Sequence, residues 1–386
     1  MRQAVILDGV RTPTGKRGGW LSHYHPVELG ATVLSELLNR SHLSPGQIDQ
    51  VIIGCVGQVG EQGANIARNI CLQAGYDEMP ATTIDFQCGS SAQALHLAAA
   101  LIQSGAADVV VAGGVESMSR VPMGSHFLNG PGTPFTPQIM QQYDLMSQGL
   151  CAELVAERWQ ITRREMDELG LRSHALAARA TEAGWFSREI VPLSSVTEEG
   201  QAFTVDRDEG IRYNASLQKM SELKPAFKQD GCITAGNSSQ ISDGAAALLV
   251  AADDKAQSLG CAPRARIAGQ CVVGVDPHLM LTGPIPATRT VLRRAGMTLP
   301  QIDLVEISEA FASVVLAWQK EMETDLSQVN TQGGAIALGH PLGASGARLL
   351  VTLLHALERT DSRFGLQTMC CGGGLGTATI LERMRP

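Results

Sequence analysis

Residues 38–51 read LNRSHLSPGQIDQV, and residues 292–305 read LRRAGMTLPQIDLV. The two stretches match at a constant offset of 254 residues, across the end of an amphipathic segment, a polar turn and the start of an apolar run. In each copy a Ser or Thr stands three residues before a Gln, which is the spacing of a helix capping box. Similarity that keeps its register over a helix, a cap and a strand indicates an internal duplication. We therefore predict two similar halves in this chain.

The sequence around the first copy predicts alternating helices and strands. Apolar residues at helical spacing predict a helix over 26–40, and apolar runs predict strands over 4–8, 51–56 and 108–114. The glycine-ended run at 364–374 is the second-half counterpart of the strand at 108–114. Together with 41 glycines, which suit many tight turns, this pattern predicts an α/β fold.

The segment 116–244 differs from its surroundings because prolines and glycines interrupt it repeatedly. Its one clear helix begins at a capping box formed by Thr162 and Glu165 and stops at Gly184. We therefore expect three parts: an N-terminal half at 1–115 and 245–262, an inserted domain at 116–244, and a C-terminal half at 263–386.

Length and composition exclude several classes of protein. A chain of 386 residues is too long for one ordinary core, and a net charge of −8 argues against nucleic acid as the main partner. No apolar run approaches the roughly 20 residues of a membrane span, and the first residues lack a signal-peptide pattern. Nine cysteines without regular spacing indicate free thiols rather than a disulfide framework or a metal site. We expect a cytoplasmic protein with no metal and no membrane span.

The stretch at 84–96 contains the first candidate reactive group. An apolar run leads into Cys88, followed by Gly-Ser-Ser and an Ala/Leu-rich segment that continues to Gly105. This pattern predicts a strand, a tight turn and a buried helix with Cys88 at its amino end. Free amides and the helix dipole at that end favour a thiolate, so we expect a reactive cysteine. The alternative is that Cys88 is a small buried hydrophobic residue.

Three further stretches occupy positions that the pattern predicts to be comparable strand-to-helix turns. They are SEAF at 308–311, GHPLGASG at 339–346 and CCGGG at 370–374. Taken with CGSS at 88–91, GGVESMS at 113–119 and AGNSSQISDG at 235–244, they resemble the thiolase family over essentially the whole length. The resemblance implies a five-layer αβαβα fold of two duplicated halves, with a loop domain inserted in the first.

The resemblance also implies a role for each motif residue. Cys88 is the nucleophile that forms a thioester with the acyl group, and His340 takes the thiol proton. Cys370 is the second acid and base, and the backbone amides of Cys88 and Gly372 form an oxyanion hole. Since successive side chains on a strand alternate, Cys371 should point away from the site.

Two residues depart from the family pattern, and two more are candidate contacts to coenzyme A (CoA). Ser308 replaces the usual Asn that holds a water beside His340, and Gln148 stands where many relatives have Met beside the acyl sulfur. By resemblance, Ser239 contacts the pantetheine arm and Arg212 lies where the loop domain approaches the nucleotide. The alternative for Arg212 is a solvated surface charge.

A thiolase of this kind would cleave a 3-ketoacyl-CoA to acetyl-CoA and a shortened acyl-CoA, with CoA as substrate and no permanently bound cofactor. The residues at 88–96 and 272–277 look more like those of degradative 3-ketoacyl-CoA thiolases than of acetoacetyl-CoA-forming acetyl-CoA acetyltransferases. The acyl group could be fatty, steroid or aromatic. The resemblance further implies a homodimer or homotetramer, with other β-oxidation enzymes as candidate partners.

The other enzyme classes explain fewer of the motifs. Ketoacyl synthases share the fold but use two histidines and would not need Cys370, and a Cys/His hydrolase leaves the duplication unexplained. The sequence at 343–347 is no nucleophile elbow because residue 347 is Ala, and the strand pattern at 377–381 argues against a dinucleotide loop at 372–376. A non-catalytic, acyl-CoA-binding thiolase-like subunit is supported by Ser308 alone and opposed by the three motif residues Cys88, His340 and Cys370.

Overall fold

The computed structural model describes residues 2–128, 131–196 and 200–385. Within these residues the two halves share one mixed ten-stranded sheet in the order β10-β11-β12-β9-β1-β8-β5-β3-β4, with β2 (Gly15–Lys16) beside β8. The first half contributes β1 (Ala4–Arg11), α1 (Pro26–Ser41), β3 (Gln50–Gly54), α2 (Ile66–Gln73), β4 (Ala81–Ile84), α3 (Ser90–Ser104), β5 (Val109–Ser117), β8 (Ser242–Ala252) and α9 (Asp253–Ser258). The second half contributes β9 (Ala265–Gly274), α10 (Pro284–Ala295), β10 (Leu304–Ile307), α11 (Ala312–Met322), α12 (Ala335–Leu338), α13 (Ser345–Arg359), β11 (Phe364–Cys371) and β12 (Leu375–Arg383).

The repeated sequence has the same local structure in both halves. Helix α1 is followed by the C-cap residue His42 and α10 by the C-cap residue Gly296, both in the left-handed conformation and 254 residues apart. A short 3-10 turn with a capping box follows in each half, over Pro45–Gln47 and Leu299–Gln301, before β3 and β10 begin. The strand orders β1-β8-β5-β3 and β9-β12-β11-β10 also correspond. The predicted duplication is confirmed.

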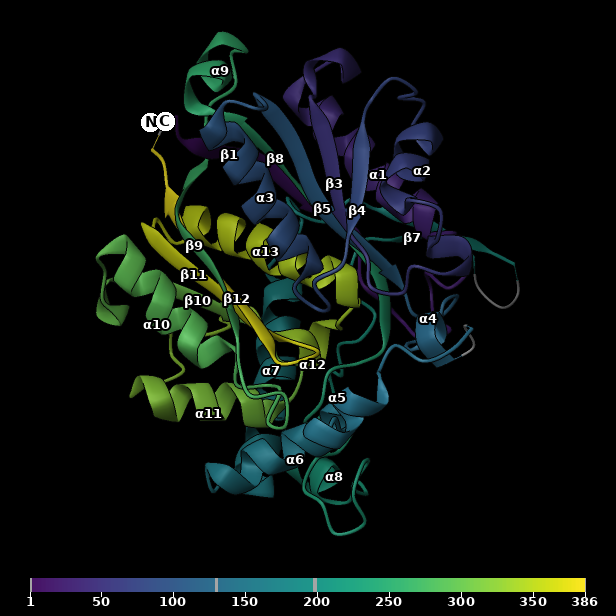
Figure 1. Cartoon of the computed structure of the whole chain (residues 1–386), viewed down its shortest axis with the longest axis vertical. Coiled ribbons are helices and arrows are strands. Elements are labelled where there is room, and N and C mark those ends of the chain that lie inside the picture. The colour runs from purple at the N-terminus through teal and green to yellow at the C-terminus, as the bar shows by residue number, and fades with distance from the viewer. Residues whose placement is uncertain (1, 129–130, 197–199, 386) are drawn as a thin grey trace.

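The helices form three layers around the two parts of the sheet (Figure 1). Helices α3 and α13 contact each other and strands of both halves, so they form the central layer. Helix α1 covers β1, β5 and β8 on one outer side, and α10 covers β9, β11 and β12 on the other. This is the five-layer αβαβα arrangement that the motifs imply.

Glycines allow the backbones of the two halves to approach each other closely near the amino-terminal ends of α3 and α13. A Cβ on Gly114 would lie 2.0 Å from the carbonyl oxygen of Gly343, and a Cβ on Gly346 would lie 2.5 Å from the amide nitrogen of Ala92. Contacts this short are not possible for any other residue without movement of the backbone. The motif glycines therefore bring the 339–346 loop onto the start of α3.

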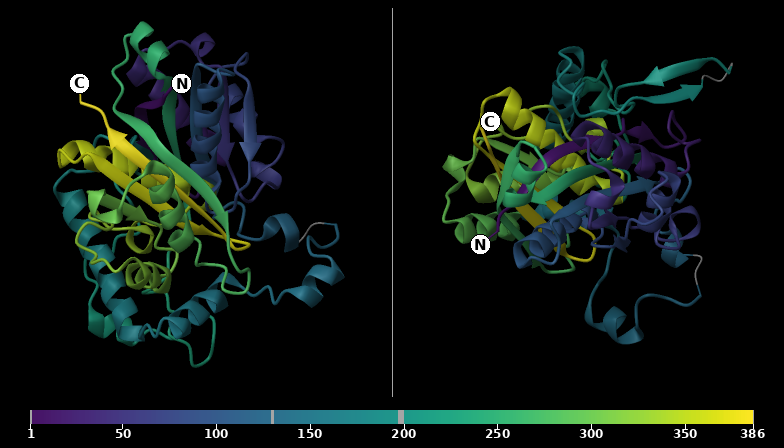
Figure 2. Two further views of the ribbon diagram at one scale, coloured as in Figure 1. Left: turned by 60° about the vertical axis from the view of Figure 1, so that its left-hand side comes forward. Right: turned by 90° about the horizontal axis from the view of Figure 1, so that it is seen from above.

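The segment between β5 and β8 contains more regular structure than the sequence predicts. The expected helix is α7 (Arg163–Glu182), with Thr162 and Glu165 as its capping box. The structure adds α4 (Ser125–Leu128), α5 (Pro137–Gln142), α6 (Gln148–Arg158), α8 (Leu217–Ser221) and the hairpin of β6 (Leu193–Val196) and β7 (Ala202–Val205), which projects from the body in Figure 2. Helices α6 and α7 pack on α11, and α7 also packs on α12. We keep the division at 116–244 as a proposal.

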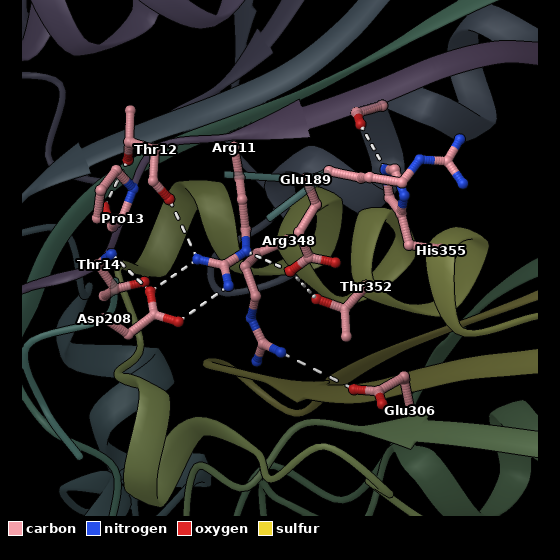
Figure 3. A network of polar contacts seen from close by, with 12 residues as sticks. Arg11, Thr12, Pro13, Thr14, Glu189, Asp208, Glu306, Arg348, Thr352 and His355 are labelled. Atoms are coloured by element: carbon pink, nitrogen blue, oxygen red, sulfur yellow. Dashed lines mark hydrogen bonds and ion pairs between the residues drawn. The ribbon is translucent and has the colours of Figure 1, made fainter. Parts of the chain in front are cut away.

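Buried charges connect this segment to both halves (Figure 3). The Arg11 guanidinium donates to Glu189 at 2.6 Å and to both oxygens of Asp208 at 2.7 and 2.9 Å. Thr352 of α13 donates to the same Glu189 carboxylate at 3.0 Å. Arg11, Glu189 and Asp208 are buried, and a buried charge that loses its partner is costly. This network therefore holds the inserted segment in one place on the two halves.

Two local expectations are wrong. Cys370 and Cys371 end β11 and lead through Gly372–Gly374 into β12, so this motif lies at a hairpin rather than at a strand-to-helix turn. His340 follows the short helix α12, not a strand. At the first motif Gly373 and Gly374, both with positive φ, reverse the chain at once, and at the second Gly339 with a φ of 99° ends α12 just before His340.

Among the described residues, no helix is long and apolar enough to cross a membrane. The same residues contain no group of three or more His, Cys, Asp or Glu side chains that could hold a metal ion. All nine cysteines are free thiols.

Candidate active site

The turn that carries Cys88 lies between β4 and α3, at the carboxyl end of the first-half strands. Asp85 accepts a hydrogen bond from the amide of Gln87 at 2.6 Å, and Ser90 accepts one from the amide of Phe86 at 2.8 Å. Gln87 has a φ of 51°, a backbone conformation that costs free energy for residues other than glycine. This tight turn places Cys88 two residues before α3 with only 3% of its surface exposed.

The environment of Cys88 differs from the sequence-based expectation of a thiolate. Burial raises the pKa of the Cys88 thiol to about 11, although backbone amides of Gly372 and Cys88 and the Gln148 side chain hydrogen-bond to it and lower the pKa. The helix dipole is therefore outweighed by the loss of water around the sulfur. At neutral pH the free protein holds Cys88 as a thiol, which needs a base to remove its proton.

The imidazole of His340 is held in one orientation by a neighbouring hydroxyl. Its Nδ1 lies 2.6 Å from Ser345 Oγ, and that hydroxyl donates its own proton to the Pro341 carbonyl at 2.8 Å. Ser345 can therefore only accept from His340, which puts the imidazole proton on Nδ1. His340 Nε2 is buried and has no hydrogen-bond partner. Burial, and secondly the Arg348 cation, lower the pKa of His340 to about 4, so the free Nε2 is a proton acceptor at neutral pH.

Glu116 holds the His340 loop against the Cys88 side of the site, a role that the sequence analysis missed. Its carboxylate accepts hydrogen bonds from the amides of Val56, Gly57 and Gly343 at 2.9, 3.0 and 2.9 Å. It also accepts one from Gln62 Nε2 at 2.6 Å. The sequence does contain a signal for this role, which is a carboxylate within the mostly apolar strand at 109–117. A buried charge requires partners.

The two adjacent cysteines of β11 face opposite sides of the sheet. Cys370 packs in the cluster that contains Cys151 and Phe311, beneath α6 and α11. Cys371 packs in the cluster that contains Cys88, and its thiol accepts a hydrogen bond from the backbone of Gly89. Burial, with the nearby Cys88 as the next cause, raises the pKa of both thiols.

Cys371 therefore lies on the same side as Cys88, and the expectation that it points away from the site is wrong. The alternation along the strand is as expected, but the Cys88 turn lies across the end of the strand, so residues on both faces approach it. A Cβ on Gly89 would lie 2.6 Å from Cys371 Sγ, which explains why the residue after Cys88 is glycine.

Ser308 lies at the carboxyl end of β10, next to the end of β11. Its amide donates to the Thr368 carbonyl at 3.1 Å, while its Oγ is buried and has no hydrogen-bond partner. The neighbouring Glu309 is anchored by Asn330 at 2.9 Å and Ser173 at 2.6 Å. An orphaned hydroxyl in an otherwise satisfied polar region suits a bound water or substrate oxygen.

The two expected CoA contacts, and Gln148, which is expected beside the acyl sulfur, lie on different elements. Ser239 is half-buried, and its amide donates to the Ala310 carbonyl at 2.9 Å, which links it to the Ser308 stretch. The backbone amide of Arg212 donates to His174 Nδ1 at 3.1 Å, while its side chain is exposed. Gln148 is the first residue of α6 and contacts Cys88.

Replacing Ser345 tests the orientation of His340. In Ser345→Ala the imidazole loses the acceptor for its Nδ1 proton, so the tautomer with a free Nε2 is no longer favoured. We expect the rate of Cys88 acylation by a thioester substrate to fall by roughly tenfold to 100-fold, a part of what general base catalysis contributes. Ser345→Thr retains the hydroxyl and should restore most of the rate, measured in stopped flow. Equal rates in wild type and Ser345→Ala would contradict this assignment.

Comparison with known proteins supports the resemblance to thiolases along the chain. Residues 4–254 match the thiolase N-terminal domain and residues 261–383 the thiolase C-terminal domain. The chain is 48% identical to a steroid 3-ketoacyl-CoA thiolase, FadA6, of Mycobacterium tuberculosis, over 100% of this chain and 95% of that protein. It is 44% identical to a 3-ketoacyl-CoA thiolase of Klebsiella pneumoniae, over 100% of both chains.

A solved structure of a related protein has the same fold. The crystal structure of the Bacillus anthracis acetyl-CoA acetyltransferase superposes with a TM-score of 0.91 at 40% identity, covering 100% of this chain and 99% of that one. With both family domains matched and relatives similar over their full length, the chain belongs to the thiolase family.

Proposed function

We propose that this protein is a degradative thiolase that cleaves a 3-ketoacyl-CoA with CoA, through an acyl-enzyme on Cys88. The observations that support it best are that the buried thiols of Cys88 and Cys370 lie close enough to interact, and that the segment after His340, whose Nε2 is free, packs on the start of α3. Cys88 comes from the first half, and His340 and Cys370 come from the second. An acyl transfer that breaks a carbon–carbon bond needs one nucleophile and two proton-transfer groups.

In the first half-reaction, the Cys88 proton moves to His340 Nε2 and the thiolate attacks the keto carbon of the substrate. The amides of Cys88 and Gly372 donate to the oxygen that becomes negative. The bond between C2 and C3 then breaks and leaves the acyl group on Cys88. The acetyl-CoA carbanion takes the proton of Cys370 and departs as acetyl-CoA.

In the second half-reaction, the Cys370 thiolate removes the thiol proton of an incoming CoA. The CoA sulfur attacks the acyl carbon, the bond to Cys88 breaks, and the shortened acyl-CoA leaves. Cys88 recovers its proton from the His340 imidazolium, and Cys370 is protonated again. No permanently bound cofactor is needed, because CoA enters as substrate, with Ser239 and Arg212 as its proposed contacts.

The degradative direction is favoured by the names of the similar proteins. Relatives at 48% and 44% identity are called steroid 3-ketoacyl-CoA thiolase and 3-ketoacyl-CoA thiolase, and one at 43% is called beta-ketoadipyl-CoA thiolase. These names cover steroid and dicarboxylic acyl groups, so they do not select one acyl chain. Acetoacetyl-CoA formation is the second candidate, since a relative at 43% is called acetyl-CoA acetyltransferase.

The decisive experiment is mass spectrometry of the intact protein after mixing with a panel of fatty, steroid and aromatic 3-ketoacyl-CoAs. We expect an acyl adduct on the peptide that contains Cys88 for at least one class, and release of acetyl-CoA without added CoA. If acetyl-CoA alone acylates Cys88 and no longer substrate does, the acetoacetyl-CoA-forming activity replaces the degradative one. A protein that forms no adduct with any substrate would be a non-catalytic acyl-CoA-binding subunit.

Ser308→Asn tests the residue that departs from the family pattern. Asn should reach further toward the thioester oxygen, so we expect a faster Claisen step and an almost unchanged rate of Cys88 acylation by a substrate analogue. The gain should stay below the roughly 10²-fold to 10³-fold that one oxyanion donor contributes. The two rates are measured separately by single-turnover kinetics. A Claisen rate that is the same in wild type, Ser308→Asn and Ser308→Ala would exclude a role for this side chain.

We also propose that the protein works in the cytoplasm as a homodimer or homotetramer. Its nine free thiols suit a reducing compartment. Strand β4 ends the sheet, and an edge strand needs a cover to avoid uncontrolled pairing. Sedimentation velocity at micromolar concentration should give a dimer or larger species, and a monomer would contradict the proposal.

A further inference from the structure

Gln148 is a polar residue placed directly beside the Cys88 sulfur. It is the first residue of α6, and its side-chain amide hydrogen-bonds to the Cys88 thiol. A Cβ on Gly372 would lie 3.1 Å from Gln148 Nε2, so the amide also borders the Gly372 backbone that donates to the same sulfur. Helix α6 of the inserted segment thus contributes a polar group to the surroundings of the Cys88 sulfur.

The charge balance around Cys88 indicates what this contact does. The titratable groups that act on the sulfur are Glu116 from β5 and Cys370 and Cys371 from β11, and the proposed base, His340, is neutral. None of these is a cation in the free protein, and Glu116 opposes a negative sulfur. The thiolate must therefore be stabilised by hydrogen-bond donors, and these are the amides of Gly372 and Cys88 and the side chain of Gln148.

The chemistry of a side-chain amide determines its orientation here. A thiolate only accepts hydrogen bonds, so the NH₂ end of Gln148 stabilises it and the carbonyl end would repel it. A hydrogen bond to a charged acceptor in a buried site is stronger than one between neutral groups. The contact therefore gains strength at the moment when the Cys88 proton moves to His340.

We propose that Gln148 is a catalytic residue of this chain, which donates its side-chain N–H to the Cys88 sulfur and stabilises the thiolate before acyl transfer. The inference rests on the proposed function, in which Cys88 is the nucleophile. A thioether at this position, as in a methionine, has no hydrogen to donate. The substitution thus changes how the nucleophile is activated and not only the shape of the acyl pocket.

The test measures the reactivity of Cys88 without relying on thiolase turnover. Wild type, Gln148→Met and Gln148→Glu are treated with iodoacetamide at several pH values from 7 to 9.5, and alkylation of the peptide containing Cys88 is followed by mass spectrometry. Gln148→Met keeps the length of the side chain and removes the donor. Gln148→Glu keeps the shape and replaces the donor by an acceptor. Gln142→Met, on the exposed helix α5 with a side-chain hydrogen bond to Tyr143, is the matched control.

We expect Gln148→Met to lower the alkylation rate at pH 8 by roughly threefold to tenfold. This is the net effect of a thiol pKa about one unit higher and a somewhat more nucleophilic thiolate. Gln148→Glu should be slower still, and Gln142→Met should match wild type. A role in packing alone would give equal losses in the Met and Glu variants, and that result, or a Gln148→Met rate equal to wild type, overturns the proposal.

Acylation by substrate separates this inference from the function on which it rests. If wild type forms the acyl-enzyme while Gln148→Met is alkylated and acylated at wild-type rates, Gln148 is not a donor and the thiolase assignment stands. If wild type forms no acyl-enzyme, the function fails, and with it the catalytic role of Gln148, whatever the alkylation rates.

Discussion

Cys88→Ala is expected to abolish the acyl-enzyme and to reduce turnover by roughly 10⁴-fold or more, as the loss of a catalytic nucleophile does. No other described thiol can replace it. Burial raises the pKa of the Cys370 thiol, whose proposed role is proton transfer, and Cys371 is a buried thiol held by the amide of Gly89. Without the Cys88 sulfur, the C2–C3 bond of the substrate has no group to which the acyl fragment can transfer.

The measurement is the mass of the intact protein after mixing with a 3-ketoacyl-CoA, together with the release of acetyl-CoA. Cys71→Ala is a suitable control, because Cys71 is another buried free thiol, on α2 and away from the site. It should acylate like wild type. A stoichiometric acyl adduct on Cys88→Ala would refute the assignment of the nucleophile.

Cys370→Ala should have the second largest effect, a loss of turnover of roughly 10²-fold or more, which is the order of a general acid and base. Acylation of Cys88 by an activated thioester should persist, since that step does not require proton transfer by Cys370. Exchange of the acetyl-CoA methyl protons with deuterated solvent, followed by NMR, isolates the step that Cys370 serves. This exchange should be lost in Cys370→Ala.

The neighbouring thiol provides the comparison. Cys371→Ala keeps the Gly89 amide in place and removes a sulfur that takes no proton from substrate or CoA, so its exchange rate should stay within about threefold of wild type. Loss of the buried sulfur should instead cost on the order of 1 kcal/mol of unfolding free energy, measured in urea. If Cys371→Ala loses exchange and Cys370→Ala retains it, the roles of the two cysteines are interchanged.

The sequence determined the fold, because the elements that define it are local. The caps at Ser44 and Thr298, the helical spacing before each and the strand after each depend on residues within a few positions of one another. The constant offset then revealed the duplication without any knowledge of contacts. The motif glycines likewise predicted tight turns, although not that 370–374 forms a hairpin. The catalytic roles of Cys88, His340 and Cys370 came from the resemblance and stay predictions.

The tertiary structure alone decided how the site is assembled and charged. Helix α6 lacks clear amphipathic spacing and forms against α11, so the sequence could not place Gln148 on Cys88. The raised pKa of Cys88 follows from burial by both halves, which outweighs the helix end visible in the sequence. Glu116 acts through Gly343, 227 residues away, and only the packing of one half on the other brings them together. Local preferences are written in neighbouring residues, whereas burial and partners depend on chain segments that meet only in the folded protein.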